Sequence, residues 1–212
     1  MHEEVLPAGT RSVLERLTQN GILGSAYLAG GTNIALQLGH RISRDLDFFT
    51  AQKFDERVLL QRLEEQGFTP ESVDWQTIYG FFGGVKFSYF FYSYPLLFEP
   101  IVYAAVPLAD LRDAAAMKVE AIAARGTRRD FIDLFVLMRD KSWQMADLFA
   151  WYQKKYGGTR NTILHALKSL AYFVDADADD TPLVLLQPIE WTEVKQYFRD
   201  AVSGYVQEAF RE

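Results

Sequence analysis

The chain has 212 residues, 49% of them hydrophobic and 24% charged, so it can bury a core in one domain of moderate size or two small ones and is not disordered. Its net charge of −6 argues against a general nucleic-acid coat protein, because non-specific binding depends on neutralising phosphates. The absence of cysteine excludes disulfides and cysteine-ligated zinc.

The first half mixes helical and strand patterns. Apolar residues recur at helical spacing in three segments, for which we predict helices: 10–19, 32–38 and 55–66. Short apolar or alternating runs predict five strands: 25–29, 46–50, 76–82, 85–92 and 99–106. Gly83-Gly84 separates two of these strands and is typical of a hairpin. In the helix over 55–66, Val58, Leu59 and Leu63 are expected on the buried side.

After Pro107 the composition changes to alanine-rich, helical sequence. Helices are expected over five segments: 111–124, 128–139, 144–155, 160–172 and 189–210. The acidic run 175–180 is expected to be a solvated loop. The pattern therefore predicts an α+β fold, with a mixed α/β core over 1–107 and a helical domain over 108–212.

A glycine turn and a pair of aspartates are the first candidate site. In Gly30-Gly31-Thr32 the glycines let backbone N–H groups approach an anion, and the helix that follows adds a positive dipole. The structural alternative is a tight turn with Thr32 as the helix N-cap. Asp45 and Asp47 share one face of the next strand, an arrangement that suits a divalent cation. Their alternative is a salt bridge with nearby Arg41 or Arg44.

Two further candidates lie in the helical half. Lys118 sits in an otherwise small and apolar helix, where it can reach a phosphate or extend its amine into water. Asp130 follows Thr127 at the spacing of a capping box, which would account for it as a structural residue. The functional alternative is that Asp130 orients Lys118 or a substrate, while Arg125, Arg128 and Arg129 hold phosphates.

Taken together, these segments resemble a known family. Gly30-Gly31-Thr32, then the segment 44–49, is similar to the first motif of the AbiEii/AbiGii nucleotidyltransferase toxins, within the DNA polymerase β-like superfamily. The segment 110–118 is similar to the lysine motif of that family, and 125–134 to its final arginine-aspartate motif. The resemblance covers about residues 20 to 140 and implies a polymerase β-like nucleotidyltransferase core with a small mixed sheet, followed by a helical part.

The resemblance also implies a function and a set of site residues. It implies transfer of a nucleotide from an NTP to an acceptor, with RNA and in particular tRNA as the acceptor, by a toxin that an antitoxin protein restrains. The catalytic residues it implies are Asp45, Asp47, Lys118 and Asp130. The metal ligands it implies are Asp45 and Asp47, for Mg²⁺ or Mn²⁺. The nucleotide-binding residues are Gly30, Gly31, Thr32, Lys118 and Arg129.

The chain departs from the family pattern at one position. The superfamily usually supplies a third carboxylate from a neighbouring strand, whereas the matching segment here is Val85-Lys86-Phe87-Ser88, with serine in its place. Two alternatives therefore stay open: a catalytically impaired module that binds nucleotides or partners on the same scaffold, and a nucleotidyltransferase that acts on small molecules. The sequence has neither a signal pattern nor a membrane-spanning apolar run, so we expect a cytoplasmic protein with no membrane contact.

Overall fold

The structure is a computed structural model that describes residues 1–209, and it divides into two compact units. The first unit comprises Met1–Asp110, and the second begins at Leu111. The sequence analysis had placed the boundary three residues earlier, after residue 107. Each unit is described by itself.

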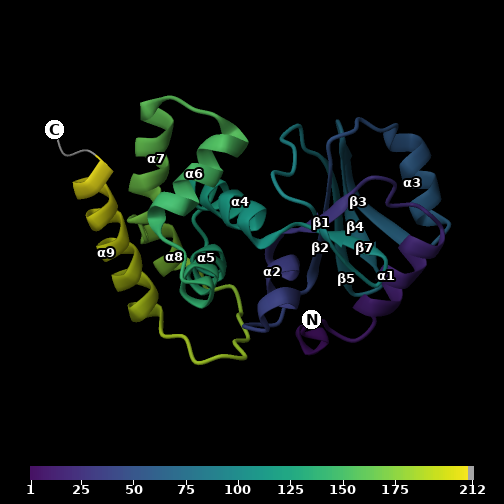
Figure 1. Ribbon diagram of the computed structural model, residues 1–212. Coiled ribbons are helices and arrows are strands. Elements are labelled where there is room, and N and C mark those ends of the chain that lie inside the picture. Colours follow the sequence, from purple (N-terminus) through teal and green to yellow (C-terminus); the bar gives the residue numbers. More distant parts are fainter. Residues whose placement is uncertain (210–212) are drawn as a thin grey trace. The chain divides into compact units, whose positions relative to one another are not determined.

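The first unit is built on a seven-stranded sheet with the order β3-β4-β5-β2-β1-β7-β6 (Figure 1). Its strands are β1 (Tyr27–Ala29), β2 (Asp45–Thr50), β3 (Phe68–Asp74), β4 (Thr77–Phe82), β5 (Val85–Phe91), β6 (Ile101–Tyr103) and β7 (Val106–Leu108). The pairs β2–β5 and β1–β7 are parallel and the other four are antiparallel. The sheet is therefore mixed, as predicted.

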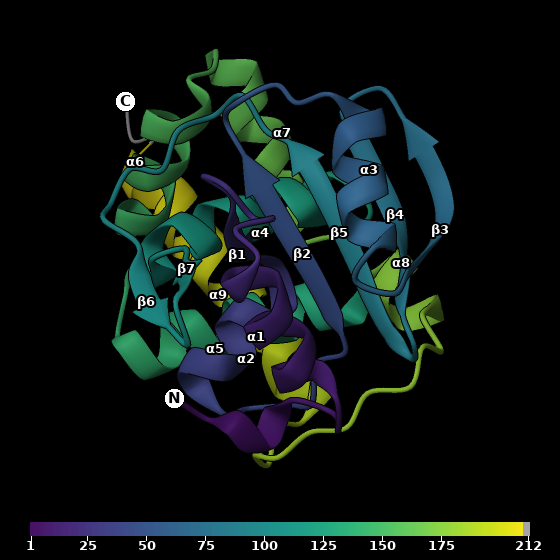
Figure 2. The same cartoon turned by 90° about the vertical axis from the view of Figure 1, so that its right-hand side faces the viewer.

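Helices accompany this sheet, and two of them cover one face. They are η1 (Glu3–Val5), α1 (Thr10–Gln19), α2 (Gly30–Leu38) and α3 (Glu56–Glu64). Figure 2 shows α1 and α3 in front of the strands. Apolar side chains of both helices, such as Leu14 and Leu63, join Leu46, Phe48 and Phe87 of the strands in one buried cluster. That face of the sheet forms the core of the unit.

Three expectations for this unit were wrong. Residues 99–106 form two strands rather than one, because Ala104 and Ala105 adopt positive φ angles of 47° and 63° and turn the chain. The edge strand β3 was missed, since its burial pattern is almost wholly exposed and gives no apolar alternation. Val58 is exposed, whereas its neighbours Leu59 and Leu63 are buried.

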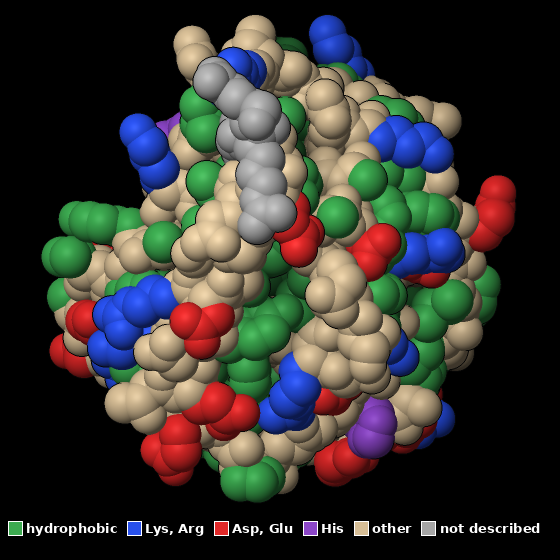
Figure 3. Space-filling model, turned by 60° about the vertical axis from the view of Figure 1, so that its left-hand side comes forward, with side chains coloured by type: hydrophobic (Ala, Val, Ile, Leu, Met, Phe, Trp, Pro, Cys, Tyr) green, Lys and Arg blue, Asp and Glu red, His purple; other side chains and the backbone are tan. Residues whose placement is uncertain are grey.

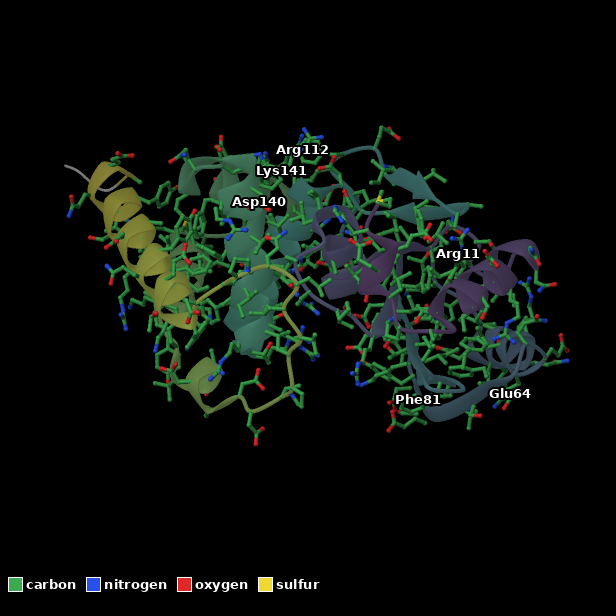
Figure 4. All side chains as sticks on the ribbon, turned by 90° about the horizontal axis from the view of Figure 1, so that it is seen from below. Arg11, Glu64, Phe81, Arg112, Asp140 and Lys141 are labelled. Carbon is green, nitrogen blue, oxygen red and sulfur yellow. The ribbon has the colours of Figure 1, made fainter. Side chains whose placement is uncertain are left out.

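The second unit is a set of helices. These are α4 (Leu111–Ala124), α5 (Arg128–Lys141), α6 (Met145–Tyr156), α7 (Arg160–Leu170), α8 (Val174–Ala178) and α9 (Trp191–Ala209). Helix α4 packs against α5, α6 and α7, and α9 packs against α5, α6 and α7. Figure 4 shows Arg112, at the start of α4, on the same side as Asp140 and Lys141 at the end of α5, as expected for an antiparallel pair.

The acidic segment was expected to be a loop, and this was wrong. Residues 174–178 form the short helix α8, and two carboxylates of the run, those of Asp177 and Asp179, make hydrogen bonds. Asp179 accepts a hydrogen bond from the backbone N–H of Arg128 at 3.0 Å, at the start of α5. Asp177 accepts from Trp191 Nε1 at 2.6 Å and from Lys195 Nζ at 2.9 Å, so it ties α8 to α9. The predicted end of the last helix, Phe210, lies outside the described residues.

Charges of both signs occur on the surface of the second unit. Figure 3 shows Lys and Arg side chains interspersed with Asp and Glu on the side of the molecule where α9 ends. No helix within residues 1–209 is both long and apolar enough to cross a membrane.

Candidate active site

The glycine turn lies against the second aspartate. Strand β1 ends at Ala29, which pairs with Asp47 of antiparallel β2, so the turn that follows begins beside that carboxylate. Gly30 has a φ of +67°, and a Cβ added to it would stand 2.9 Å from Asp47 Oδ2. A side chain at this position would thus be both strained and in collision. The glycine allows the backbone to approach the carboxylate.

Helix α2 starts at this turn with an uncapped N-terminus. Its N-cap is Ala29, which has no side chain that can accept a hydrogen bond, so Thr32 is not the N-cap that the structural alternative assumed. The backbone N–H groups of the first helical turn lack intrahelical acceptors and can bind an anion there. Gly31 and Thr32 lie in this turn.

The side chain of Thr32 has an internal role. It is buried, and its hydroxyl is hydrogen-bonded to the hydroxyl of Ser43 at 2.7 Å and to the carbonyl of Asp45. These contacts link α2 to the residues on which β2 begins. Thr32 therefore holds Asp45 in place through its side chain and offers a ligand only its backbone N–H.

Asp45 and Asp47 occupy one face of β2, as the alternation predicted. Both are half-buried, whereas Leu46 between them is fully buried in the core. Arg44, which was considered as a salt-bridge partner, makes no ion pair with another residue in the range 1–209. The two carboxylates project from the face of the sheet opposite to α1 and α3.

The neighbouring strand brings hydroxyl groups to this face. In the register of parallel β2 and β5, Asp47 stands opposite Ser88 and Asp45 opposite Lys86. Ser88 in turn pairs with Tyr79 of β4. Burial, followed by the negative charges of Asp47 and Asp74, raises the pKa of Tyr79, so its hydroxyl is protonated and can donate a hydrogen bond.

Tyr79 was not among the predicted site residues, because only the strand register places it in the same row as Asp47. Within residues 1–209, no three acidic, histidine or cysteine side chains are grouped to hold a metal ion. The carboxylate set on this face is therefore Asp45 and Asp47, beside the hydroxyls of Ser88 and Tyr79.

In the second unit, Lys118 is enclosed by two aspartates. Only 4% of Lys118 is exposed, which rules out the alternative of an amine extended into water. Its Nζ lies 2.8 Å from Asp130 Oδ1 and 2.8 Å from Asp133 Oδ2, and both carboxylates are fully buried. The packing of α4 against α5 brings both of these α5 carboxylates to Lys118.

Asp130 is the centre of this cluster. Besides Lys118, it binds Arg125 through two hydrogen bonds of 2.8 and 3.0 Å and accepts one from the Thr127 hydroxyl at 2.6 Å. Burial alone would favour protonation, but Lys118 and Arg125 outweigh it and hold the pKa of Asp130 well below its ordinary value. The predicted capping box is absent, since the Thr127 side chain binds Asp130 rather than the helix backbone.

The two arginines at the start of α5 lie elsewhere in the same unit. Both line a cavity of about 370 Å³ with Asp179 and Trp191. Arg128 Nε donates to the carbonyl of Ala176 at 3.1 Å, so this side chain is part of the packing of α8. Arg129, the predicted phosphate ligand, lines the cavity.

The predicted residues therefore form two groups, each defined within its own unit. Gly30, Gly31, Thr32, Asp45 and Asp47 come together in the first unit, and Lys118 meets Asp130 in the second. A pair of sheet carboxylates beside an uncapped helix N-terminus suits a divalent cation next to a phosphate, which is what phosphate-transferring proteins such as nucleotidyltransferases require.

Comparison with known families agrees with this class. The model of the family described as "nucleotidyl transferase AbiEii toxin, type IV TA system" matches residues 12–82 and 80–211. The chain belongs to this family of nucleotidyltransferases. It is also 36% identical over 206 residues to an uncharacterized protein of Aquifex aeolicus (strain VF5), an alignment that spans 93% of this chain and 96% of the relative.

Solved structures share the fold. MenT4, a nucleotidyltransferase toxin from Mycobacterium tuberculosis H37Rv, superposes with a TM-score of 0.56 at 18% identity, covering 91% of this chain and 84% of that one. JHP933 from Helicobacter pylori superposes with a TM-score of 0.55 at 17% identity, covering 93% and 91%. The predicted polymerase β-like nucleotidyltransferase fold is confirmed.

Proposed function

We propose that this protein is a magnesium-dependent nucleotidyltransferase toxin that transfers a nucleotide from an NTP to an RNA acceptor, in particular tRNA, in the cytoplasm. The observation that carries the proposal is the position of Asp45 and Asp47 on one sheet face, with Gly30 and the uncapped start of α2 against Asp47. This arrangement offers carboxylates for a metal and backbone N–H groups for a phosphate within one unit.

The residues present fit Mg²⁺, and Mn²⁺ as a substitute. Mg²⁺ prefers hard oxygen ligands and is commonly held by one or two carboxylates together with water and substrate phosphates. Asp45 and Asp47 meet this requirement without a third carboxylate, and the hydroxyl of Ser88 opposite Asp47 adds a neutral oxygen. A bound Mg²⁺ would polarise the phosphate and lower the pKa of an acceptor hydroxyl.

In the proposed reaction, an acceptor hydroxyl attacks the α-phosphorus of the NTP. A phosphorus–oxygen bond to the acceptor forms, the bond to the β-phosphate breaks, and pyrophosphate leaves while the hydroxyl proton passes to solvent. The N–H groups of Gly31 and Thr32 would bind the oxygens of the phosphate chain, where the dipole of α2 favours negative charge. Thr32 also fixes the start of β2 through Asp45.

Lys118 and Arg129 are proposed to bind phosphate, and Asp130 to position Lys118. Asp130 accepts hydrogen bonds from Lys118, Arg125 and Thr127, and its lowered pKa makes it a weak base. We therefore favour the positioning role for Asp130 over deprotonation of the acceptor.

The biological setting rests on the family. Its description names a toxin of a type IV toxin–antitoxin system, which supports an antitoxin protein as a partner. MenT4, a structural neighbour, is a nucleotidyltransferase toxin. RNA as the acceptor is inferred from the resemblance of the three motifs to those of toxins of this kind.

One alternative is a module that binds nucleotide or a partner but does not catalyse transfer, and Ser88 at the position of the third carboxylate favours it. The other is a nucleotidyltransferase for small hydroxylated molecules. It is favoured by the structural likeness to the antibiotic-resistance factor ANT(2'')-Ia, which superposes with a TM-score of 0.54 at 12% identity.

The test is transfer of label from each of the four NTPs to total cellular RNA, with Mg²⁺ or Mn²⁺. We expect labelled RNA with the parent chain and background with Asp47→Asn, while Asp74→Asn, which changes an exposed carboxylate of β3, keeps the parental rate. Absence of label in all conditions would contradict the RNA proposal. Calorimetric NTP binding without any transfer would favour the binding module, and label on a small acceptor alone would favour the other alternative.

A further inference from the structure

The first unit contains a cavity of about 790 Å³ that the proposed reaction does not use. It is lined by the start of α1, the turn before β3 at Gly67 and the hairpin Gly83-Gly84 between β4 and β5. The charged side chains in its lining are those of Arg16 and Arg44, and no lining residue is acidic. The lining is therefore positively charged, although the chain as a whole has a net charge of −6.

Neither of these arginines is neutralised by a carboxylate within residues 1–209. Arg16 Nη1 donates to the carbonyl of Gln66 at 3.1 Å, and its guanidinium lies 5.8 Å from the centroid of the Phe82 ring, so the side chain is held in place. Arg44 is exposed and makes no hydrogen bond or ion pair in the described chain. The cavity is therefore locally positive and has donors available for an anion.

The start of α1 adds further donors. The N-cap of this ten-residue helix is Gly9, which has no side chain to cap it, so N–H groups of the first turn lack intrahelical acceptors. Thr10, which also lines the cavity, is 1% exposed, and its hydroxyl has no hydrogen-bond partner in the part of the chain that is described. An unpartnered buried hydroxyl is costly and indicates that a partner is missing.

We propose that this cavity is a second anion site, which binds the phosphate groups of a polynucleotide strand or of a free nucleotide. Planar guanidinium groups and helix N-termini are the groups that recognise phosphate in proteins. The site is separate from the carboxylate pair, because it is lined by Phe82 and Val85 of the buried face, whereas Asp45 and Asp47 project from the other face. The proposal goes beyond nucleotidyl transfer and does not require it.

The test measures binding to the full chain in EDTA, which removes metal-dependent binding at the carboxylates. The probes are a fluorescent 12-nucleotide RNA, ATP and pyrophosphate. We expect Arg44→Glu to weaken binding of at least one probe about tenfold and to reduce the salt dependence of that binding. The matched control is Arg57→Glu, an equal charge change at an exposed arginine of α3, with an expected effect below about twofold.

A second variant tests the cavity itself. A Cβ on Gly84 would meet no atom within 4 Å, so Gly84→Glu introduces a carboxylate with little strain, and we expect it to weaken binding as Arg44→Glu does. Loss confined to the RNA identifies a strand as the ligand, and an equal loss with ATP and pyrophosphate identifies a free nucleotide. The proposal is overturned if the parent binds none of the probes, or if both variants bind like Arg57→Glu.

Discussion

Asp47 and Ser88 stand directly opposite each other on the parallel strands β2 and β5. Neighbouring strands are about 4.8 Å apart, so side chains at these two positions can share one ligand. In the proposed metal site, Ser88 therefore takes the place of the third carboxylate and provides only a neutral hydroxyl.

The first prediction adds that carboxylate. In Ser88→Asp, an anionic oxygen faces Asp47, and we expect the Mg²⁺ concentration for half-maximal transfer to fall several-fold, because hard cations bind charged oxygens more tightly. Ser88→Asn has a similar size without the charge and should leave the Mg²⁺ requirement unchanged. Transfer rates measured over a range of Mg²⁺ concentrations give this requirement for each variant. Equal titration curves for the two variants would contradict the placement of the metal.

The second prediction concerns Gly30. Gly30→Ala forces a left-handed residue and places a Cβ 2.9 Å from Asp47 Oδ2, so we expect it to lose about 1–2 kcal/mol of stability and to displace the carboxylate. Gly24→Ala is a matched control, since Gly24 also has a positive φ (+56°) but open space around it. Thermal unfolding should show a loss of stability in both variants, whereas transfer activity should fall only in Gly30→Ala. A similar activity for the two would refute a role for close approach at Asp47.

The third prediction is a pH dependence of stability. The pKa of Asp130 is lowered in the folded chain, so its ion pairs stabilise the fold at pH values above its ordinary pKa of 3.8 and are lost as the pH falls toward the folded value. We expect Asp130→Asn to cost about 3–5 kcal/mol near neutral pH, because it leaves Lys118 buried with less compensation. Urea unfolding of parent and variant should show this difference shrinking at about pH 3. A difference independent of pH would argue against an ionised Asp130.

The fourth prediction addresses a buried pair away from the candidate site. Lys155 Nζ lies 2.7 Å from Asp113 Oδ1, and both side chains are fully buried between α6 and α4. Lys155→Met alone should cost about 3–5 kcal/mol, since it removes the buried cation that lies 2.7 Å from the Asp113 carboxylate. The double variant Asp113→Leu/Lys155→Met should recover most of this loss, as apolar packing often replaces such pairs. Denaturant unfolding measures both, and additive losses would show that the pair is not coupled.

The sequence by itself determined the features that depend on local pattern. The bounds of α1 and α4 were predicted as the structure has them, because apolar residues repeat there at the helical period and Gly126 follows the end of α4. The shared face of Asp45 and Asp47 followed from strand alternation alone. Membership of the nucleotidyltransferase family followed from three motifs in order.

Only the tertiary structure decided which side chains meet across elements. Strand register places Tyr79 and Ser88 in the row of Asp47, and no periodicity in one strand encodes the register with another. The packing of α4 against α5 brings Asp130 and Asp133 together around Lys118. Local spacing favoured a capping box and a solvated acidic loop. In the structure, Asp130 binds the buried amine of Lys118, because a buried charge requires a partner. Asp179 binds the backbone N–H of Arg128, because the first N–H groups of a helix have no acceptor within the helix.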